Sequence, residues 1–192
     1  MKKRCEWATD DLLKKYHDTE WGVPLYNDRK LFEFLILDGA QAGLSWSTIL
    51  KKRDAYRNAF DRFNPKKIAQ YGRTDMRRLL ENDGIIRNRQ KIESAVNNAG
   101  CFLEVKSEFG SFHEYIWRFV GHKTITNRYS RWKNIPAYTN ESCDMSKDLK
   151  SRGFSFVGPT ICYAIMQSAG MVNDHVTSCF RHMQITHMSH ND

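Results

Sequence analysis

The chain has 192 residues, of which 41% are apolar, so it can bury one sizeable hydrophobic core. Lysine and arginine number 30 against 22 acidic residues, and the net charge of +8 favours a polyanionic partner, although a solvated basic face is the simpler alternative. The basic start lacks the apolar segment of a signal peptide, and no apolar run is long enough to span a membrane. The cysteines are scattered, which predicts reduced thiols in a cytoplasmic protein; they are Cys5, Cys101, Cys143, Cys162 and Cys179.

Helical periodicity dominates the first third of the chain. Asp28 is placed to cap a helix whose broad apolar face includes Leu31 and Leu35, and Gly43 ends this helix. Ser45 is placed to cap a second helix that continues to Phe60.

Two shorter helices and a turn are predicted next. The Asn64-Pro65 pair is typical of a helix start, and Gly72 closes this short third helix. Thr74 caps a fourth helix. A turn at Asp83-Gly84 leads into a fifth helix over residues 85–99, where apolar side chains recur at helical spacing.

The second half of the chain also shows helical spacing. Ser111 caps a helix over 112–119, and residues 121–140 are predicted to form a long polar loop. Further helices are predicted over 142–150 and 161–169, with a short one over 174–179. Residues 181–192 are predicted to be a solvated polar tail that contains His182, His187 and His190. No alternating run is long enough for a strand, so we predict an all-α class in a single compact domain over 1–192.

The predicted turn at Gly84 is a candidate for phosphate binding. A glycine turn that leads into a helix presents free backbone N–H groups, and the cations that follow, Arg87, Arg89 and Lys91, attract a phosphate. This pattern is typical of a helix-hairpin-helix unit. A helical hairpin with a charged outer face explains it equally well.

Two cysteines and two histidines could form a metal site. Cys5 and His17 lie near one end of the chain, whereas His175 and Cys179 lie near the other, four residues apart and on one face if that segment is helical. Two thiolates and two imidazoles complete a tetrahedral zinc site of the structural kind. On spacing alone, four unrelated residues are the simpler interpretation.

A carboxylate among aromatic residues is a candidate base-binding pocket. Asp38 lies in an apolar run, where burying an acid is unfavourable unless a partner donates hydrogen bonds to it. Tyr16, Trp21 and Trp46 could enclose the faces of a purine whose amine donates to this acid. The alternative places the tryptophans in the core and Asp38 at a solvated helix end.

The Gly43-Leu44 pair lies between the first two predicted helices. It is the sequence of an ordinary turn with one packing leucine. An apolar tip of this kind can also insert between bases and fill the space of an extruded one.

Three segments carry a resemblance to a known family. They are residues 16–24 (YHDTEWGVP), 41–46 (QAGLSW) and 153–175 (GFSFVGPTICYAIMQSAGMVNDH). In these segments and between them, from about Cys5 to Cys179, the chain resembles the bacterial type I 3-methyladenine DNA glycosylases, the Tag family.

The resemblance implies a helix-hairpin-helix glycosylase fold with a hairpin at 83–91 that binds phosphates. It also implies that Cys5, His17, His175 and Cys179 are structural zinc ligands, which join the segments 1–24 and 165–180. Tyr16 and Trp46 become walls of the base pocket, with Trp21 close by, and Leu44 becomes the inserted tip. Where the chain has Asp38, typical family members have Glu; both are acceptors when ionised, but Asp is one methylene shorter.

The implied function is repair of alkylated duplex DNA. By this resemblance, the protein extrudes 3-methyladenine and hydrolyses its bond to deoxyribose. The sequence gives no sign of a lysine nucleophile, so we expect a monofunctional enzyme. We also expect a monomer without an obligate protein partner or membrane contact. The main alternative is a lesion sensor with the same fold that binds the base without releasing it.

Overall fold

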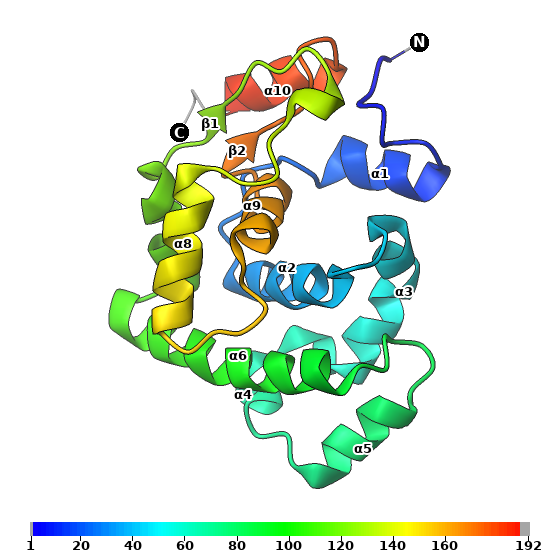
Figure 1. Ribbon diagram of the computed structural model, residues 1–192, viewed down its shortest axis with the longest axis vertical. Helices are drawn as coiled ribbons and strands as arrows, with labels where there is room; N and C mark the ends of the chain where they lie inside the picture. The colour runs from blue at the N-terminus through cyan, green and yellow to red at the C-terminus, as the bar shows by residue number, and fades with distance from the viewer. Residues whose placement is uncertain (1, 189–192) are drawn as a thin grey trace.

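The structure, a computed structural model, describes residues 2–188 and is built mainly from helices (Figure 1). In chain order the longer elements are α1 (Asp11–Thr19), α2 (Asp28–Gln41), α3 (Trp46–Ala59), α4 (Pro65–Ile68), α5 (Arg73–Glu81), α6 (Arg89–Phe109), α7 (Phe112–Trp117), α8 (Asn140–Ser151), α9 (Pro159–Ser168) and α10 (Phe180–Met188). Short 3-10 turns lie at η1 (Asp61–Phe63), η2 (Arg118–Val120) and η3 (Trp132–Asn134). The two-residue strands β1 (Ile125–Thr126) and β2 (Val172–Asn173) pair in parallel, with Ile125 opposite Val172. The predicted helical class is therefore confirmed.

Helix α2 is the centre of the fold. Every residue from Leu31 to Ala40 is buried, so the helix has no exposed face along most of its length. It packs against α3, α6, α7 and α9 (Figure 1). Asp38 lies in this buried stretch and is only 2% exposed, so the alternative of a solvated helix end is wrong.

The predicted helix caps are largely confirmed. The side chains of Ser45, Asn64 and Ser111 each accept a backbone N–H at the start of α3, α4 and α7. Helix α2 is instead capped by Asn27, because Asp28 is turned toward α7 and accepts hydrogen bonds from two of its backbone amides.

Two predicted boundaries in the region of the hairpin are wrong. Helix α5 begins after Gly72, not at Thr74, because the side chain of Asp75 accepts the Gly72 N–H. Helix α6 begins at Arg89, not at residue 85, since the side chain of Asn88 caps it by accepting the N–H of Lys91. Residues 85–88 are therefore a loop between the two helices.

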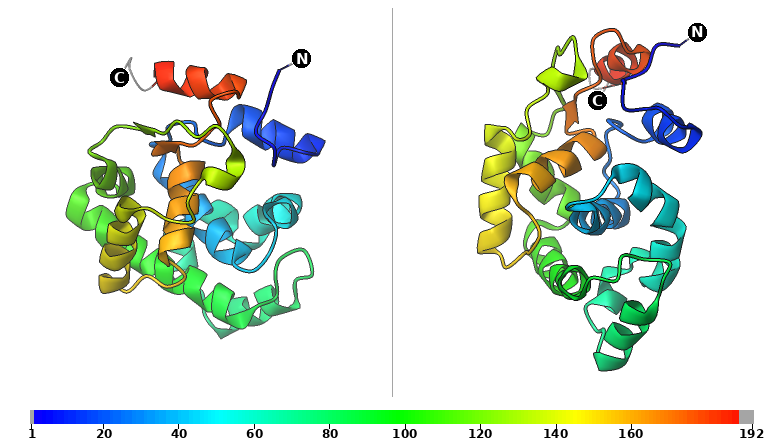
Figure 2. Two further views of the ribbon diagram at one scale, coloured as in Figure 1. Left: turned by 45° about the horizontal axis from the view of Figure 1, so that its top comes forward. Right: turned by 45° about the vertical axis from the view of Figure 1, so that its right-hand side comes forward.

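The N-terminal segment and α10 lie beside each other at one end of the molecule, above α9 in Figure 1 and again in both views of Figure 2. The N–H of Phe180 donates to the carbonyl of Lys3 at 3.0 Å. The segment after α1 also crosses the end of α9, with Gly22 and Leu25 donating to carbonyls there. Gly170 permits this crossing, because a Cβ there would lie 2.4 Å from the Val23 backbone.

The predictions for residues 174–188 are wrong in two respects. Residues 174–179 form turns rather than a short helix, and the helix begins at Phe180. Residues 181–188 belong to α10 rather than to a solvated tail. Ile185 is fully buried, and His182 bonds to the carbonyl of Asn127 at 2.8 Å. The polar composition concealed this helix, because few apolar residues anchor it. Residues 189–192, with His190, lie outside the described residues.

Within residues 2–188, none of the helices has the length and apolar content that crossing a membrane requires.

Candidate functional site

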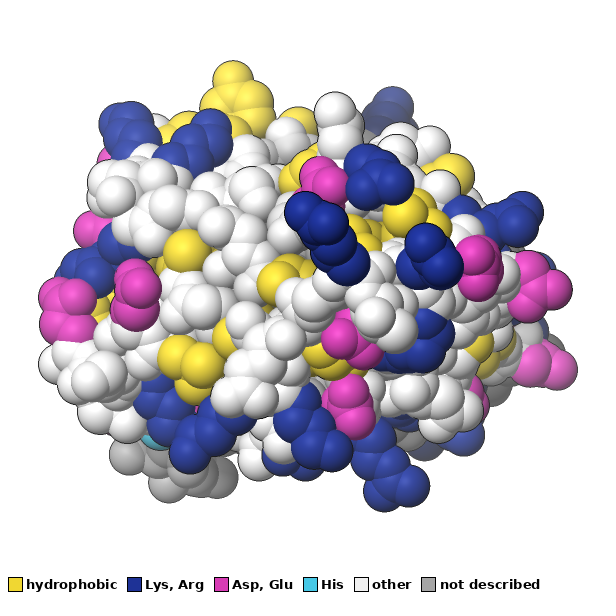
Figure 3. All heavy atoms as spheres, turned by 90° about the horizontal axis from the view of Figure 1, so that it is seen from below, with side chains coloured by type: hydrophobic (Ala, Val, Ile, Leu, Met, Phe, Trp, Pro, Cys, Tyr) yellow, Lys and Arg dark blue, Asp and Glu magenta, His cyan; other side chains and the backbone are white. Residues whose placement is uncertain are grey.

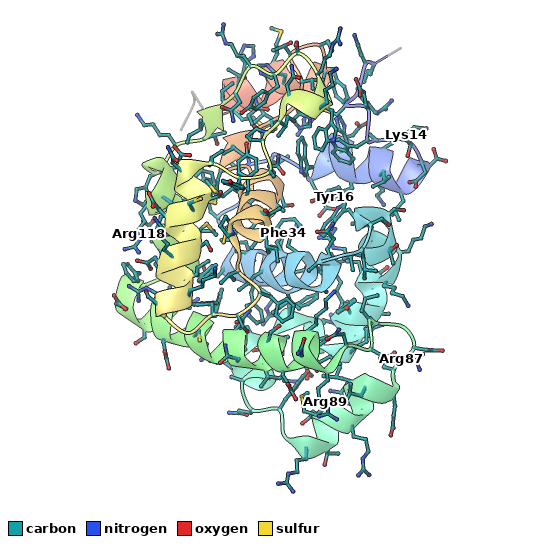
Figure 4. The ribbon with its side chains drawn as sticks, viewed as in Figure 1. Lys14, Tyr16, Phe34, Arg87, Arg89 and Arg118 are labelled. Carbon is teal, nitrogen blue, oxygen red and sulfur yellow. The ribbon has the colours of Figure 1, made fainter. Side chains whose placement is uncertain are left out.

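A cavity of about 340 Å³ opens between α1, the α2–α3 turn and α9. Five of its thirteen lining residues are aromatic. In Figure 4, one of them, Tyr16, projects from α1 toward α2 and α3. The lining residues are Trp7, Leu13, Tyr16, Trp21, Asp38, Gln41, Ser45, Trp46, Ser47, Trp132, Ala164, Gln167 and Ser168. All four residues predicted for a base pocket (Tyr16, Trp21, Asp38 and Trp46) line this one cavity.

Asp38 is a buried acid with an unpaired oxygen. Its Oδ2 atom has no hydrogen-bond partner among the residues that the structure describes. Burial therefore raises the pKa of this carboxyl well above its ordinary value, and the nearby Arg53 offsets only part of the effect. The carboxyl is thus biased toward its neutral form.

Two other carboxylates also interact with Arg53. Its guanidinium donates to Glu33 on α2 and, at 2.9 Å, to Glu20 after α1, and it lies over the ring of Phe34. These ion pairs hold α2 at Glu33, and Arg53 makes no hydrogen bond to Asp38. A ligand that brings a positive charge into the cavity would favour the Asp38 carboxylate.

Tyr16 and Trp46 pack against each other in the cavity wall. Their ring centroids lie 5.5 Å apart at an interplanar angle of 49°. The Tyr16 hydroxyl donates to Ser168 on α9 at 3.1 Å, which fixes the ring. Burial and the neighbouring Asp38 raise the pKa of Tyr16 far above its ordinary value, so the hydroxyl remains a donor.

Several residues of this wall were not predicted from the sequence, and Trp7 and Trp132 are the largest of them. Trp7 packs against Trp21 at 5.2 Å and Trp132 at 6.0 Å between ring centroids. The indole N–H groups of Trp7 and Trp46 are buried and, within residues 2–188, have no acceptor. Three residues that line the cavity, Trp7, Trp46 and Asp38, thus each have a buried polar atom without a partner among the described residues.

The Gly43-Leu44 pair forms an exposed tip beside the cavity. Gly43 adopts a φ of +79°, which favours glycine, and Leu44 is 38% exposed. Gln41, which lines the cavity, donates from its amide to the Leu44 carbonyl at 2.9 Å. The tip and the cavity wall are therefore one continuous piece of chain.

The predicted phosphate-binding residues lie at the opposite end of the molecule from α10. Arg87 and Arg89 are exposed beside the α5–α6 turn (Figure 4). Gly84 packs tightly in this turn, since a Cβ would lie 2.9 Å from that of Ala55. Lys91 is different: its ammonium donates to the carbonyls of Ala40 and Ala42 at the end of α2.

The four predicted metal ligands meet in one buried cluster. One ligand atom from each of Cys5, His17, His175 and Cys179 lies within 4.8 Å of the others. The Cys179 Sγ atom lies 3.4 Å from His17 Nε2 and 3.6 Å from His175 Nδ1. Residues 174–179 form turns, so the prediction that a helix brings His175 and Cys179 together is wrong. The two side chains nevertheless meet in the cluster.

The surroundings of this cluster orient both imidazoles. His17 Nδ1 lies 2.8 Å from Asp18, which Arg4 also holds, and His175 Nε2 lies 3.1 Å from the Trp21 carbonyl. Each ring therefore directs its other nitrogen toward the sulfurs. The Cys5 thiol, hydrogen-bonded to Cys179, has a raised pKa, whereas this bond and those from the two histidines lower the pKa of Cys179.

Comparison with known sequences gives a consistent result. The sequence profile of a family described as "Methyladenine glycosylase" matches residues 7–182. The chain is 46% identical over 180 residues to the DNA-3-methyladenine glycosylase of Haemophilus influenzae, covering 93% of this chain and 97% of the relative. It is also 46% identical to DNA-3-methyladenine glycosylase 1 of Escherichia coli, covering 92% and 95%.

Solved structures resemble the chain along the same length. A crystal structure of 3-methyladenine DNA glycosylase I superposes with a TM-score of 0.90 at 47% identity, covering 93% of this chain and 98% of that one. A tyrosine-to-phenylalanine variant of such an enzyme, in complex with 3-methyladenine, superposes with a TM-score of 0.89 at 36% identity, covering 92% and 96%.

Proposed function

The chain belongs to the methyladenine glycosylase family, and we infer from this that it is a DNA-3-methyladenine glycosylase of base-excision repair. It hydrolyses the N-glycosidic bond between 3-methyladenine and deoxyribose. The observation that carries this function in the chain itself is the aromatic cavity with one buried, unpaired carboxyl.

We propose that the cavity selects the base by its positive charge. Adenine methylated at N3 is cationic while it is attached to deoxyribose, and a delocalised cation is attracted by the faces of tryptophan and tyrosine rings. Tyr16 and Trp46 supply these faces, with Trp21 beside them. An unmodified adenine is neutral and gains only the stacking.

Asp38 strengthens this selection in the proposal. A cationic base in the cavity favours the carboxylate, which then accepts a hydrogen bond from the exocyclic amine. A neutral base does not offset the burial that disfavours the charged form of Asp38. The carboxylate is thus more favoured when the lesion is present than when it is absent.

The base must leave the duplex to reach this cavity. The cavity lies beside the exposed Leu44 tip, which is apolar and held by the Gly43 turn. We propose that Leu44 enters the space of the extruded nucleotide, because an apolar side chain can replace the lost stacking.

We propose that the α5–α6 turn is a helix-hairpin-helix unit that binds phosphates. Arg87 and Arg89 are exposed there, and Gly84 packs so closely against Ala55 of α3 that a Cβ would lie 2.9 Å from the Ala55 Cβ. Figure 3 shows the face with α4, α5 and α6, over which cations are spread with acids among them. Binding therefore depends on specific contacts in the turn more than on a continuous basic surface.

We further propose that Cys5, His17, His175 and Cys179 hold a structural zinc ion. Two thiolates and two imidazoles are a donor set that zinc prefers, and all four side chains are buried, so water is excluded. The bonds from His17 to Asp18 and from His175 to the Trp21 carbonyl are those expected behind histidine ligands. The ion would join the N-terminal segment to the turn before α10.

No lysine lines the cavity in the part of the chain described, which supports hydrolysis without strand cleavage. The test is a duplex oligonucleotide treated with a methylating agent and incubated with the protein. We expect strand breaks in excess of those in DNA incubated without the protein, and only after brief, mild alkaline treatment that cleaves abasic sites but leaves 7-methylguanine intact. Breaks before alkali would contradict monofunctional hydrolysis, and no breaks with retained DNA binding would indicate a lesion sensor.

A further inference from the structure

Lys91 has an unexpected position for a residue of the DNA-binding hairpin. It lies in the first turn of α6, its side chain is half-buried, and its ammonium is bonded to backbone carbonyls of the protein. Its Nζ atom donates to the carbonyl of Ala42 at 2.7 Å and to that of Ala40 at 2.9 Å. Both carbonyls belong to the end of α2.

The end of α2 needs such a partner. The last carbonyls of a helix have no partner within the helix, and a cation there also offsets the negative end of the helix dipole. The last turn of α2 contains no basic residue of its own. Lys91 supplies this cation from a different helix.

The two carbonyls that Lys91 contacts, those of Ala40 and Ala42, flank Gln41, a residue of the cavity. Gln41 lines the cavity and donates to the carbonyl of Leu44, so it links the cavity to the exposed tip. Asp38 lies about one helical turn before Ala42. A shift at Ala40 and Ala42 would move both the carboxyl and the tip.

We propose that Lys91 is a positioning residue, which couples the α5–α6 hairpin to the base pocket. When the hairpin binds the DNA backbone, α6 and Lys91 hold the end of α2 at a fixed distance from the bound DNA strand. Asp38 and the Leu44 tip are positioned with it. The inference rests on the proposed function of the hairpin and the cavity. It makes Lys91 a determinant of the excision rate rather than a phosphate contact.

The test compares Lys91→Met with Lys106→Met. Both lysines lie on α6 and bond to oxygens of α2, but Lys106 bonds at 2.7 Å to Asp28 at the other end of α2, far along the helix from the cavity. At saturating enzyme on methylated duplex DNA, we expect Lys91→Met to slow single-turnover excision about tenfold or more, since a small misplacement of reacting groups has effects of this size. DNA affinity should change by less than about threefold. Lys91→Arg should restore most of the rate, because it retains a cation and donors.

Amide hydrogen exchange gives a second readout that does not depend on activity. The N–H of Leu44 donates to the Gln41 carbonyl at 2.7 Å. In Lys91→Met, exchange over residues 41–44 should accelerate, whereas in Lys106→Met it should remain as in the wild type. If the wild type releases no base, the proposed function fails, yet this measurement still tests the contact.

Three results would overturn the inference. A wild-type saturating rate in Lys91→Met, with weaker and more salt-dependent DNA binding, would make Lys91 a phosphate contact. Equal loss of rate in both methionine variants would indicate general destabilisation. Unchanged exchange over 41–44 would show that Lys91 does not hold the tip.

Discussion

Replacing Asp38 by asparagine tests the role of charge in the cavity. The asparagine side chain has almost the same shape as that of aspartate and keeps an acceptor oxygen, but it cannot ionise. Since Asp38 is 2% exposed and its Oδ2 atom has no partner within residues 2–188, the substitution breaks no observed hydrogen bond at that atom. Any loss of excision therefore reports on the interaction with the base.

The size of the loss follows from the buried setting. Two unit charges 4 Å apart interact by about 4 kcal/mol at an effective dielectric constant of about 20. The unfavourable burial of the carboxylate offsets part of this interaction energy. Net contributions of about 1.5–3 kcal/mol are typical of hydrogen bonds to charged groups. A loss of about 2 kcal/mol corresponds to a decrease of about 30-fold in kcat/KM for the cationic base.

The same substitution should change the pH dependence of stability. The pKa of Asp38 is raised by burial, so the neutral form favours folding and its contribution is fully present below the ordinary carboxyl pKa. It is lost as pH rises through the raised pKa. Asp38→Asn should therefore unfold at a higher temperature than the wild type near neutral pH, with the difference disappearing toward pH ~4.

The assays are single-turnover excision from methylated duplex DNA and thermal unfolding between mildly acidic and neutral pH. Asp38→Glu serves as the matched control, because it retains the charge and has the side chain that the family resemblance leads us to expect at this position. Wild-type kcat/KM in Asp38→Asn would refute the role of the carboxylate in base binding. If Asp38→Asn melted below the wild type at every pH in this range, burial would be refuted as the cause of the raised pKa.

Three further predictions concern the other parts of the site. Trp46→Ala should decrease base excision about tenfold or more, because stacking contributes about 1–3 kcal/mol per base, while DNA affinity changes little; equal losses in both would count against the pocket. Cys179→Ser should lower the melting temperature and the zinc content together, measured by calorimetry and elemental analysis, and a stable metal-free variant would refute the zinc site. Arg87→Ala should reduce the slope of log affinity against log salt by about one, and an unchanged slope would remove Arg87 from the phosphate contacts.

The sequence predicted the helices best where local chemistry decides them. Ser45, Asn64 and Ser111 cap helices as expected, because a side-chain oxygen satisfies free amides regardless of the tertiary structure. Asp28 shows where the prediction of a cap from local sequence fails. Its carboxylate is used by α7, a helix that lies more than 80 residues later, and Asn27 takes its place as the cap.

The candidate site was predicted where residues cluster in the sequence and missed where only the fold brings them together. Tyr16, Trp21, Asp38 and Trp46 lie within 31 residues of one another and line one cavity. Trp7 lies in a turn before α1 and Trp132 in the short 3-10 turn η3, far apart in the sequence, and no periodicity connects them. Helix α1 was also missed, although Asp10 caps it.

Lys91 shows a third kind of limit. Its spacing with Arg87 and Arg89 suggests a common role on DNA, and only the structure shows its ammonium at the end of α2. A residue type and its neighbours indicate which chemistry is available, whereas the direction of a long side chain is set by packing.

The central claim is that this chain removes 3-methyladenine from DNA. Chromatography of the bases released from methylated duplex DNA by the purified protein tests it most directly. We predict release of 3-methyladenine, with 7-methylguanine left in the DNA, because 7-methylguanine is also cationic but has a carbonyl in place of the adenine amine that donates to Asp38. Retained DNA binding without any released base would contradict the claim.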